Sequence, residues 1–383
     1  MRTYRDLFRT PEFTPLLLAS AWLTAAQTVA GLALGLLVFE STGSALLSSL
    51  AMFGPALAQL VGAATVLSGA DRLPPRAALT GLALFSGLGT ALQALPRLPV
   101  WALFAVLLGL GLAGSVGGGV RYGLLHEILP RDGYLLGRSV VSMSAGIVQI
   151  CGFAVGGILV ATLSARGALL AAAALHLPTA AATRFGLRPR PSRAEGRPSV
   201  TQTWRTNARL WSSAPRRAVF LALWVPNGLV VGVESLYIPY APGSAGLLFA
   251  VGALGMLAGD LLVGRVLPTR WQPPLAVPLC ALLAAPYLLF ALHPGPTLAA
   301  GLVALATVGY ASGLLLQDRL LALTPEELSG QALGLHSSAM LAVQGLGAAA
   351  AGAVAQLTSP AIGMVMTAAA SLTVTLMLAR RLD

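Results

Sequence analysis

The sequence contains no lysine, so all 24 of its basic residues are arginines. The phosphate-binding loop of P-loop ATPases needs a lysine before its Ser or Thr, and the chain therefore carries no ATPase motor of that type. Metal-binding residues are scarce too, with two cysteines and four histidines. Cys151 and Cys280 lie in separate apolar runs, and His126-Glu127 lacks the second histidine of a zinc-binding H-E-x-x-H motif. We expect no metal site and no cofactor.

Charged residues make up only 10% of the chain, against about 25% in a soluble globular domain. Hydrophobic residues make up 56%, more than a chain of 383 residues can bury by folding in water. A transmembrane helix needs about 20 predominantly apolar residues. Twelve such runs lie at about 14–38, 46–68, 77–95, 100–120, 138–163, 167–184, 218–239, 244–264, 274–292, 297–316, 331–357 and 361–379. We predict an all-α integral membrane protein with twelve transmembrane helices.

The arginines indicate how these spans are oriented. If the N-terminus is cytoplasmic, 22 arginines lie in inner segments and only Arg97 and Arg166 lie outside. Positive charge concentrates on the cytoplasmic side of membrane proteins, so we expect a bacterial-type cytoplasmic (inner) membrane protein with both termini in the cytoplasm. The net charge of +11 then reflects topology and attraction to membrane lipid, and we expect no nucleic-acid partner.

One long hydrophilic stretch divides the chain into two sets of six spans. It covers residues 186–217 and is rich in Pro, Ser and Arg. We predict an N-terminal six-helix bundle over 1–185, a basic cytoplasmic linker over 186–217 and a C-terminal six-helix bundle over 218–383. Within the linker, residues 203–211 (TWRTNARLW) are typical of a short helix at the membrane interface.

The two halves contain matching residues at a constant spacing of 195. Ser142, Gln149 and Gly152 recur in the same order as Ser337, Gln344 and Gly347. Parallel repeats of this kind imply a pseudo-two-fold axis along the membrane normal, with a central path between the halves.

The loop after the second span contains Asp71, Arg72 and Arg76. This turn resembles the most specific motif of the major facilitator superfamily, although Pro74-Pro75 replace its Gly-Arg and Leu67 its preferred Gly. The resemblance covers essentially the whole chain and implies two pseudo-symmetric six-helix halves, in which this turn latches the cytoplasmic side against span 11. We expect Asp71 to face the N-terminus of that helix, where exposed N–H groups favour an anion. The alternative is a turn that sets the topology and has no gating role.

The loop after span 8 repeats part of this pattern. Arg265 corresponds to Arg72 at an offset of 193, and Asp260 lies five residues before Arg265. We count Asp260 and Arg265 with the gating residues. We expect Asp260 to form a structural ion pair with Arg265 or a neighbouring loop charge, rather than to couple transport to an ion.

The fifth span contains GFAVGG, which resembles the G-P-x-x-G-G signature of the antiporter branch of that family, with Phe153 in place of the proline. Its glycines, Gly152, Gly156 and Gly157, let helices approach closely. The opening YRDLF and PEF segments and LLVFESTGS further resemble the branch that contains macrolide and siderophore exporters. The resemblance implies proton-driven export of a bulky amphipathic molecule.

Few polar side chains lie inside or at the ends of the predicted spans. The candidates for binding substrate or protons are Glu234, Asn227, Gln27, Arg121 and Gln317. Spans 1, 4, 7 and 10 line the cavity in the resembled family, and these residues lie on those spans. Arg121 either neutralises an anionic substrate or extends to the inner surface. We assign Gln149 and Gln344 to hydrogen bonds between helices, although they too could face the central path.

Glu234 is the only charged residue in the seventh span and lies roughly 24 Å along it, in the outer third of the hydrocarbon layer. An ionised carboxylate is costly there, so Glu234 should face a water-filled cavity or be protonated for part of the cycle. Pro226 and the nearby glycines should loosen the helix. Tyr237 and Tyr240 suit an interfacial aromatic belt, which favours the alternative that Glu234 only reaches outer headgroup water.

These features predict a monomeric secondary transporter that works by alternating access, binds a small-molecule substrate and protons, and exports a drug, macrolide or siderophore-like compound. An uptake carrier or uniporter on the same fold is one alternative. A non-transporting membrane protein, such as a lipid scramblase, is another. We expect no enzyme activity, because no catalytic groups converge at a recognisable spacing.

Overall fold

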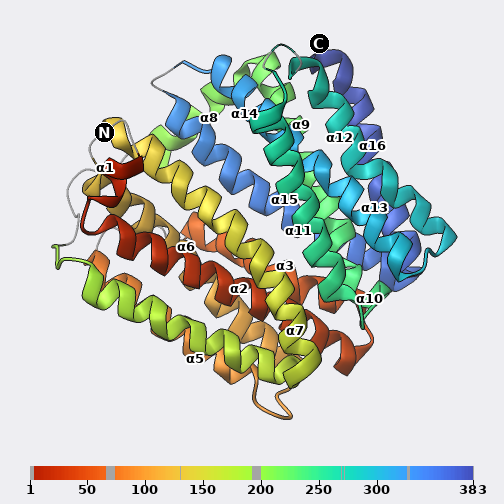
Figure 1. The fold of residues 1–383 in the computed structure, drawn as a ribbon, viewed down its shortest axis with the longest axis horizontal. Helices are drawn as coiled ribbons and strands as arrows, with labels where there is room; N and C mark the ends of the chain where they lie inside the picture. The colour runs from red at the N-terminus through yellow and green to blue at the C-terminus, as the bar shows by residue number, and fades with distance from the viewer. Residues whose placement is uncertain are drawn as a thin grey trace. The chain divides into compact units, whose positions relative to one another are not determined.

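The computed structural model describes residues 4–65, 74–129, 131–191, 200–268, 270, 272–325 and 328–382. Within these ranges the regular structure is helical (Figure 1). The helices before the hydrophilic stretch are α1 (Tyr4–Phe8), α2 (Phe13–Thr42), α3 (Ala45–Thr65), α5 (Pro75–Gln93), α6 (Val100–Ile128) and α7 (Arg131–Gly186). The helices that follow are α8 (Val200–Ser212), which lies within the hydrophilic stretch, and then α9 (Ala214–Ser235), α10 (Tyr237–Tyr240), α11 (Ala245–Leu261), α12 (Ala276–Ala284), α13 (Pro296–Val308), α14 (Ser312–Ala322), α15 (Ser329–Leu357) and α16 (Pro360–Leu382). Shorter helical turns are η1 (Leu262–Val266), η3 (Pro273–Leu275), η4 (Ala285–Leu292) and η5 (Gly309–Ala311).

The helices follow the twelve predicted apolar runs. Eight stretches of the described chain are long and apolar enough to cross a membrane, and two shorter apolar helices cover 45–59 and 276–292. The predicted fifth and sixth spans form one such stretch, α7, which is interrupted at Ser164. Ser164 has φ 73° and ψ 168°, so the chain turns there in a conformation that L-residues rarely adopt. The break falls between the two runs that the sequence predicts.

The chain divides into two compact units. The first comprises residues 1–38 and 57–196, and the second comprises 39–56 and 197–383. The end of α2 and the first half of α3 therefore belong to the second unit. There Ser44 Oγ donates a hydrogen bond to Gln356 Oε1 (2.8 Å), and Ser49 Oγ donates to the carbonyl of Ser235 (3.4 Å). The predicted boundary at 186–217 does not include this segment.

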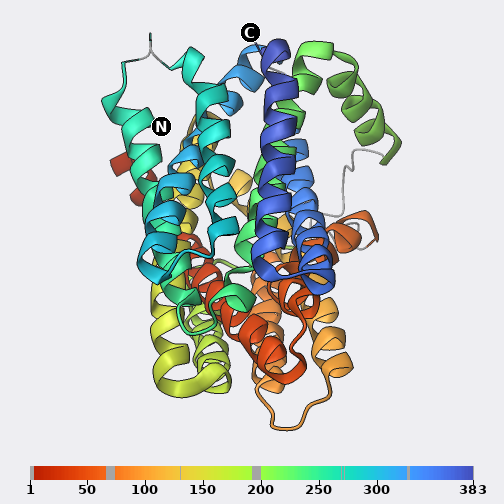
Figure 2. The same ribbon diagram turned by 90° about the vertical axis from the view of Figure 1, so that its right-hand side faces the viewer.

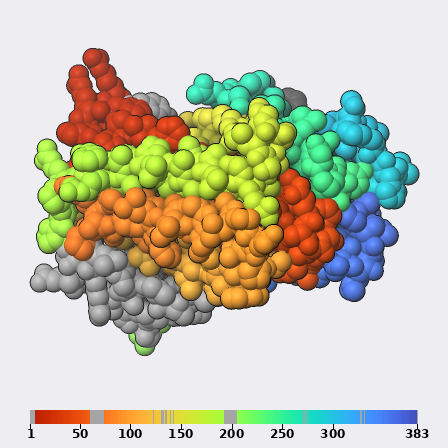
Figure 3. All heavy atoms as spheres, turned by 90° about the horizontal axis from the view of Figure 1, so that it is seen from below, coloured from red at the N-terminus to blue at the C-terminus, as the bar shows by residue number. Residues whose placement is uncertain are grey.

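In the first unit, α5 packs along α7. A Cβ added at Gly87 would lie 3.1 Å from the Cβ of His176, so the glycine allows the two helices to approach. Figure 3 shows the yellow-green part of α7 lying along the orange helices of this unit. A separate apolar cluster joins the start of α2 to the end of α6; its buried members are Leu7, Phe13, Leu16, Leu124, Leu125, Leu129, Val141 and Leu187.

In the second unit, α9 is the central helix and packs on α15 and α16. α9 and α15 meet through glycines, because a Cβ at Gly228 or Gly232 would collide with the backbone of Val343 or Gly347. α8 lies at the end of this unit that also holds the C-terminus, as Figure 2 shows with α8 in green and α16 in blue. The prediction of a short helix at 203–211 is confirmed, since α8 covers it.

Candidate functional site

Glu234 and Tyr310 form the polar centre of the second unit. Glu234 lies in the last turn of α9, and Tyr310 lies in η5, the short 3-10 turn between α13 and α14. Tyr310 Oη donates a hydrogen bond of 2.9 Å to Glu234 Oε1. The turn can press against α12 because residue 309 is glycine, and a Cβ there would meet the backbone of Leu279 and Leu283. Glu234 has no ion pair within 4.0 Å in the part of the chain that the structure describes.

Two further tyrosines close the site beyond Glu234. The hydroxyls of Tyr237 and Tyr287 lie 2.5 Å apart, and both side chains are fully buried. Tyr237 also packs on Phe249, with ring centroids 4.9 Å apart. Tyr237 therefore does not extend into an interfacial belt as expected. Its neighbour Tyr240 is half-buried and donates to the carbonyl of Pro294 (3.0 Å).

Asn227 lies seven residues before Glu234, which places both on one face of α9, two turns apart. Gln344 Nε2 of α15 donates to Asn227 Oδ1 (2.9 Å), so the predicted role of Gln344 between helices is confirmed. Asn227 and Tyr310 also line a small cavity of about 20 Å³ together with Cys280 and Ser312. This volume has room for about one water molecule with several polar partners.

α9 is continuous through Pro226, so the proline does not break the helix. The glycines that follow it are used for packing against α15. The carbonyl of Pro226 accepts a hydrogen bond from Ser371 Oγ of α16 (3.1 Å), which ties the helix to a second neighbour at this point. Glu234 is therefore carried by a helix that is packed against two neighbours.

The remaining substrate candidates lie apart from this site. Gln317 is half-buried on α14, in the span that also carries Tyr310. Gln27 on α2 is exposed and Arg121 on α6 is half-buried, and both belong to the first unit. The structure thus places Glu234 and Asn227 on one face of α9 in the second unit. Tyr310, which sequence reasoning did not select, donates to Glu234 and lines the small cavity beside Asn227.

Of the gating candidates, Asp71 and Arg72 lie outside the described residues. Arg76 is half-buried in the first turn of α5. Asp260 is half-buried near the end of α11, and Arg265 is exposed in the π-helical turn η1. Both are described and have no ion pair with each other or with another described residue, so the expected pair of Asp260 with Arg265 is wrong. The alternative, a pair with a neighbouring loop charge, stays a prediction where that charge lies outside the described residues.

The span-5 glycines pack α7 against α2 within the first unit. A Cβ at Gly152 would lie 3.1 Å from Thr28, and one at Gly156 would lie 3.4–3.5 Å from Val29 and Leu32. Gly157, next to them, is half-buried. Gly152 corresponds to Gly347 in the repeat, and Gly347 packs α15 against α9 in the same way. Each unit therefore uses equivalent glycines to bring its fifth span against its first.

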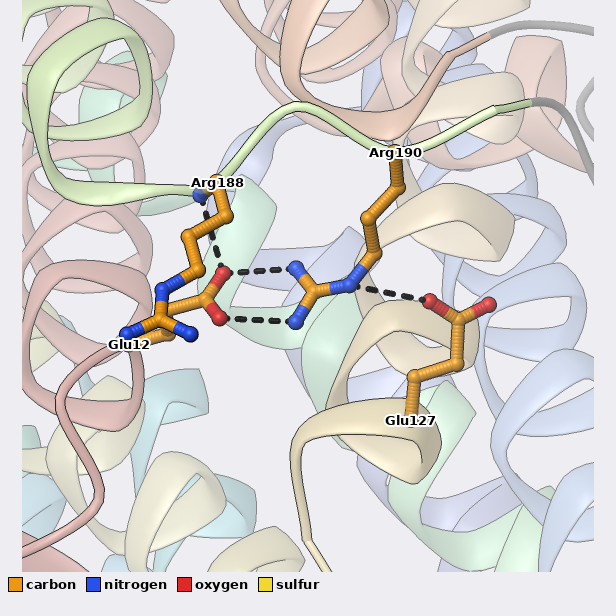
Figure 4. A network of polar contacts seen from close by, with 4 residues as sticks. All are labelled: Glu12, Glu127, Arg188 and Arg190. Atoms are coloured by element: carbon orange, nitrogen blue, oxygen red, sulfur yellow. Dashed lines mark hydrogen bonds and ion pairs between the residues drawn. The ribbon is translucent and has the colours of Figure 1, made fainter.

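The first unit contains a charge network that the sequence did not reveal, formed by Glu12, Arg188, Arg190 and Glu127 (Figure 4). Arg190 donates two hydrogen bonds to the Glu12 carboxylate, Nη1 to Oε2 at 2.6 Å and Nη2 to Oε1 at 2.7 Å. The backbone N–H of Arg188 donates to Oε2 (3.0 Å), and Arg190 Nε lies 3.6 Å from Glu127 Oε2. The network fastens the chain after α7 to the start of α2 and the end of α6.

Electrostatics hold Glu12 in its charged form. Burial would raise the pKa of Glu12, but the hydrogen bonds from Arg190 and Arg188 outweigh burial, and the pKa lies below its usual value. The hydrogen bonds from Arg190 to Glu12 in turn raise the pKa of Arg190. The sequence shows only that Glu12 is a carboxylate just before an apolar run, and it does not indicate which residue pairs with it.

Comparison with known proteins gives one family and a set of related folds. The model of the Major Facilitator Superfamily matches residues 16–318. A bacterial homolog of the human lysosomal transporter Spinster, solved inward-facing and occupied, has a TM-score of 0.74 at 13% identity, covering 100% of this chain and 97% of that one. A mutant of the nucleoside transporter NupG has a TM-score of 0.74 at 12% identity, covering 97% and 100%.

A mutant of the peptide transporter POT in complex with alafosfalin has a TM-score of 0.72 at 14% identity, covering 100% of this chain and 99% of that one. At these identities the likeness concerns the fold alone. No curated protein matches the chain in sequence.

Proposed function

The chain belongs to the major facilitator superfamily of secondary transporters, and we propose that it is a proton-coupled antiporter that exports a bulky amphipathic molecule. The observation that carries the proposal is the hydrogen bond between Tyr310 and Glu234. A carboxyl group inside a span is costly as a charged group unless it is paired or reaches water. Glu234 has a phenol as its hydrogen-bond partner and no described cation, so gain and loss of a proton is the charge change available to it.

Protonation of Glu234 changes a contact between spans. The ionised carboxylate accepts the hydrogen bond from Tyr310, whereas a protonated carboxyl group carries its own donor and competes for that geometry. Because Glu234 is on α9 and Tyr310 is between α13 and α14, the proton alters how two helices are tied together. A proton taken up on one side of the membrane and released on the other thereby biases alternating access.

Antiport is supported by the glycines of the fifth span. Gly152 and Gly156 pack α7 closely on α2, as the resemblance to the antiporter signature requires. Export of an amphipathic compound is supported by the opening PEF segment and by LLVFESTGS, because both resemble the branch of the family that contains macrolide and siderophore exporters. The fold likeness to nucleoside and peptide transporters favours a second candidate, a proton-coupled uptake carrier that uses the same Glu234 site.

The test begins with a ligand. Thermal shift of the purified protein against hydrophobic cations, macrolides and siderophores identifies a compound that binds. Its flux is then measured in oriented proteoliposomes under an imposed pH gradient, with a pH-sensitive dye inside. We expect the compound to move opposite to the proton, and Glu234→Gln to abolish gradient-driven flux while expression and thermal stability stay near wild type.

The matched control is Glu40→Gln, which removes an exposed carboxylate from α2 and should leave flux unchanged. Movement of the compound in the same direction as the proton, still dependent on Glu234, would establish the uptake carrier instead. Normal accumulation by Glu234→Gln under the gradient would refute proton coupling at this site.

A further inference from the structure

The arginines of the second unit gather at one of its ends. In the described part of the unit they are Arg205, Arg209, Arg216, Arg217, Arg265, Arg270, Arg319, Arg380 and Arg381. They lie before or at the start of α9, between α11 and α12, and at the ends of α14 and α16, and these helix ends share one apolar cluster. The described carboxylates at this end are Asp260 and Asp318. The surface is therefore strongly positive.

α8 is docked at this basic end by one of its faces. Leu210 is fully buried in the cluster with Phe220 and Trp224 of α9. Gln331 Nε2 of α15 donates to Asn207 Oδ1 (2.8 Å), which fixes the same face. The opposite face carries exposed Arg205, Ala208, Arg209 and Ser212, which helical spacing places within about 100° of one another. Two arginines thus project from a helix that is held in place by its other side.

The position of α8 puts these arginines at the level of a membrane surface. Only Ser213 separates α8 from α9, which is a candidate span. Trp211 of α8 stacks on Trp224 of α9, with ring centroids 5.6 Å apart and planes 7° apart. Tryptophans concentrate where a membrane protein crosses from hydrocarbon to headgroups, so the α8 docking site lies in that zone.

Arg216 provides a second, independent observation that points to an anionic ligand at α8. Its Nη2 donates to the carbonyl of Arg209 at the end of α8 (3.0 Å), which holds the guanidinium beside the helix. Its Nε is buried and has no acceptor among the described residues. A buried donor without an acceptor is unfavourable, and an added anionic oxygen would satisfy it.

We propose that α8, with Arg205, Arg209 and Arg216, binds the headgroups of anionic phospholipids of the bilayer. The phosphate of such a lipid offers oxygens that match the planar guanidinium donors. The docking of α8 directly beside a span supports lipid as the occupant, because lipid headgroups lie at the level where a span leaves the hydrocarbon. The proposal is independent of the transport function.

The test measures stabilisation of the purified full-length protein by lipid. Phosphatidylglycerol is titrated into detergent micelles, phosphatidylcholine is the neutral lipid, and thermal unfolding is followed. We expect phosphatidylglycerol alone to raise Tm, with an effect that weakens as salt increases. In the double variant Arg205→Gln/Arg209→Gln the lipid concentration needed for half the shift should rise about 25-fold, at about fivefold per arginine near a lipid surface.

Two variants make the result specific. Arg205→Lys/Arg209→Lys keeps the charge and should retain most of the shift. Arg97→Gln/Arg166→Gln removes two exposed arginines from the first unit and should behave as wild type. An unchanged lipid response in Arg205→Gln/Arg209→Gln, an equal response to phosphatidylcholine, or an equal shift from inorganic phosphate or an RNA oligonucleotide would each overturn the proposal. If the Gln variant does not fold, loss of the wild-type phosphatidylglycerol shift in high salt still supports it, and a salt-independent shift refutes it.

Discussion

Arg190 and Glu12, 178 residues apart in the chain, meet in a paired arrangement in which two guanidinium N–H groups donate to the two carboxylate oxygens. Glu12 is only 6% exposed and also accepts the backbone N–H of Arg188. Paired geometry of this kind gives stronger hydrogen bonds than a surface ion pair. The contact fixes where the chain leaves α7, and therefore where the segment leading to the second unit begins.

Glu12→Gln should lower the stability of the first unit by about 2 kcal/mol, because Arg190 then loses its charged partner. The effect should depend on pH. The pKa of Glu12 in the folded protein lies below the ordinary 4.5, so its stabilisation is complete above that pH and is lost as pH falls through the lower folded-state value. The difference in Tm between wild type and variant, measured from pH 7 down to pH 3, should be constant at first and then shrink.

Glu40→Gln serves as the control for this pH series, because Glu40 is exposed and should give no difference at any pH. A Glu12→Gln difference that stays constant to pH 3 would show that the variant acts through packing and not through charge.

The helices were predictable because the bilayer requires long apolar runs, and the sequence displays them. Even the break at Ser164 falls between two runs that the sequence separates. The assignment of residues 39–56 to the second unit was not predictable, since it rests on contacts such as Ser44 with Gln356. No local pattern in the sequence encodes a contact over such a distance.

Half of the candidate site was predictable for a similar reason. Glu234 is recognisable as a lone charge in an apolar span, but Tyr310 is one aromatic residue among many. The expected pair of Asp260 and Arg265 failed because the helix changes to the π-helical turn η1 after Asp260, and Arg265 is exposed whereas Asp260 is half-buried. Sequence therefore reveals a group that is out of place in its surroundings, and gives little information about its partner.

Gly347→Ala should destabilise the second unit by about 1–3 kcal/mol, since the added methyl group collides with the backbone of Gly228 across the α9–α15 contact. Gly334→Ala, on the same helix, is the matched control because its Cβ would meet nothing within 4 Å. There the better helix propensity of alanine should leave stability unchanged or raise it. Thermal unfolding of the two variants decides the matter, and equal Tm values would mean that close packing at Gly347 is unimportant.

The family resemblance of the turn after the second span implies that Asp71 faces the N-terminus of span 11. If it does, Asp71→Asn should remove an attraction of about 0.3–1 kcal/mol and shift the transporter toward its inward-open state without unfolding it. Accessibility of engineered cysteines to reagents from each side measures the shift, in a Cys151→Ser background because Cys151 is exposed. Labelling identical to that of the parent would leave the turn with no gating role.

The basic segment 186–217 should be cleaved by trypsin in inverted vesicles and protected in intact cells. Within it, cleavage at Arg205 and Arg209 should be slow, because α8 is helical and docked and must open locally first. Fragment masses distinguish these positions. Cleavage of this segment from outside intact cells would reverse the proposed orientation.

Tyr310→Phe tests the partner that the structure adds to Glu234, because it removes the hydroxyl and keeps the ring. Because Tyr310 donates to the Glu234 carboxylate, loss of the hydroxyl changes the stability of the ionised form relative to the protonated form and should therefore change the pH dependence of transport. In a Glu234→Gln background the same change should have no further effect on gradient-driven flux, since the two residues act as one unit. Tyr240→Phe removes a hydroxyl that donates to Pro294 instead and should leave the pH profile where it is. An unchanged pH profile in Tyr310→Phe, with transport still dependent on Glu234, would contradict this prediction. The carboxylate would then exchange its proton with water alone, and the contact between α9 and η5 would play no part in coupling.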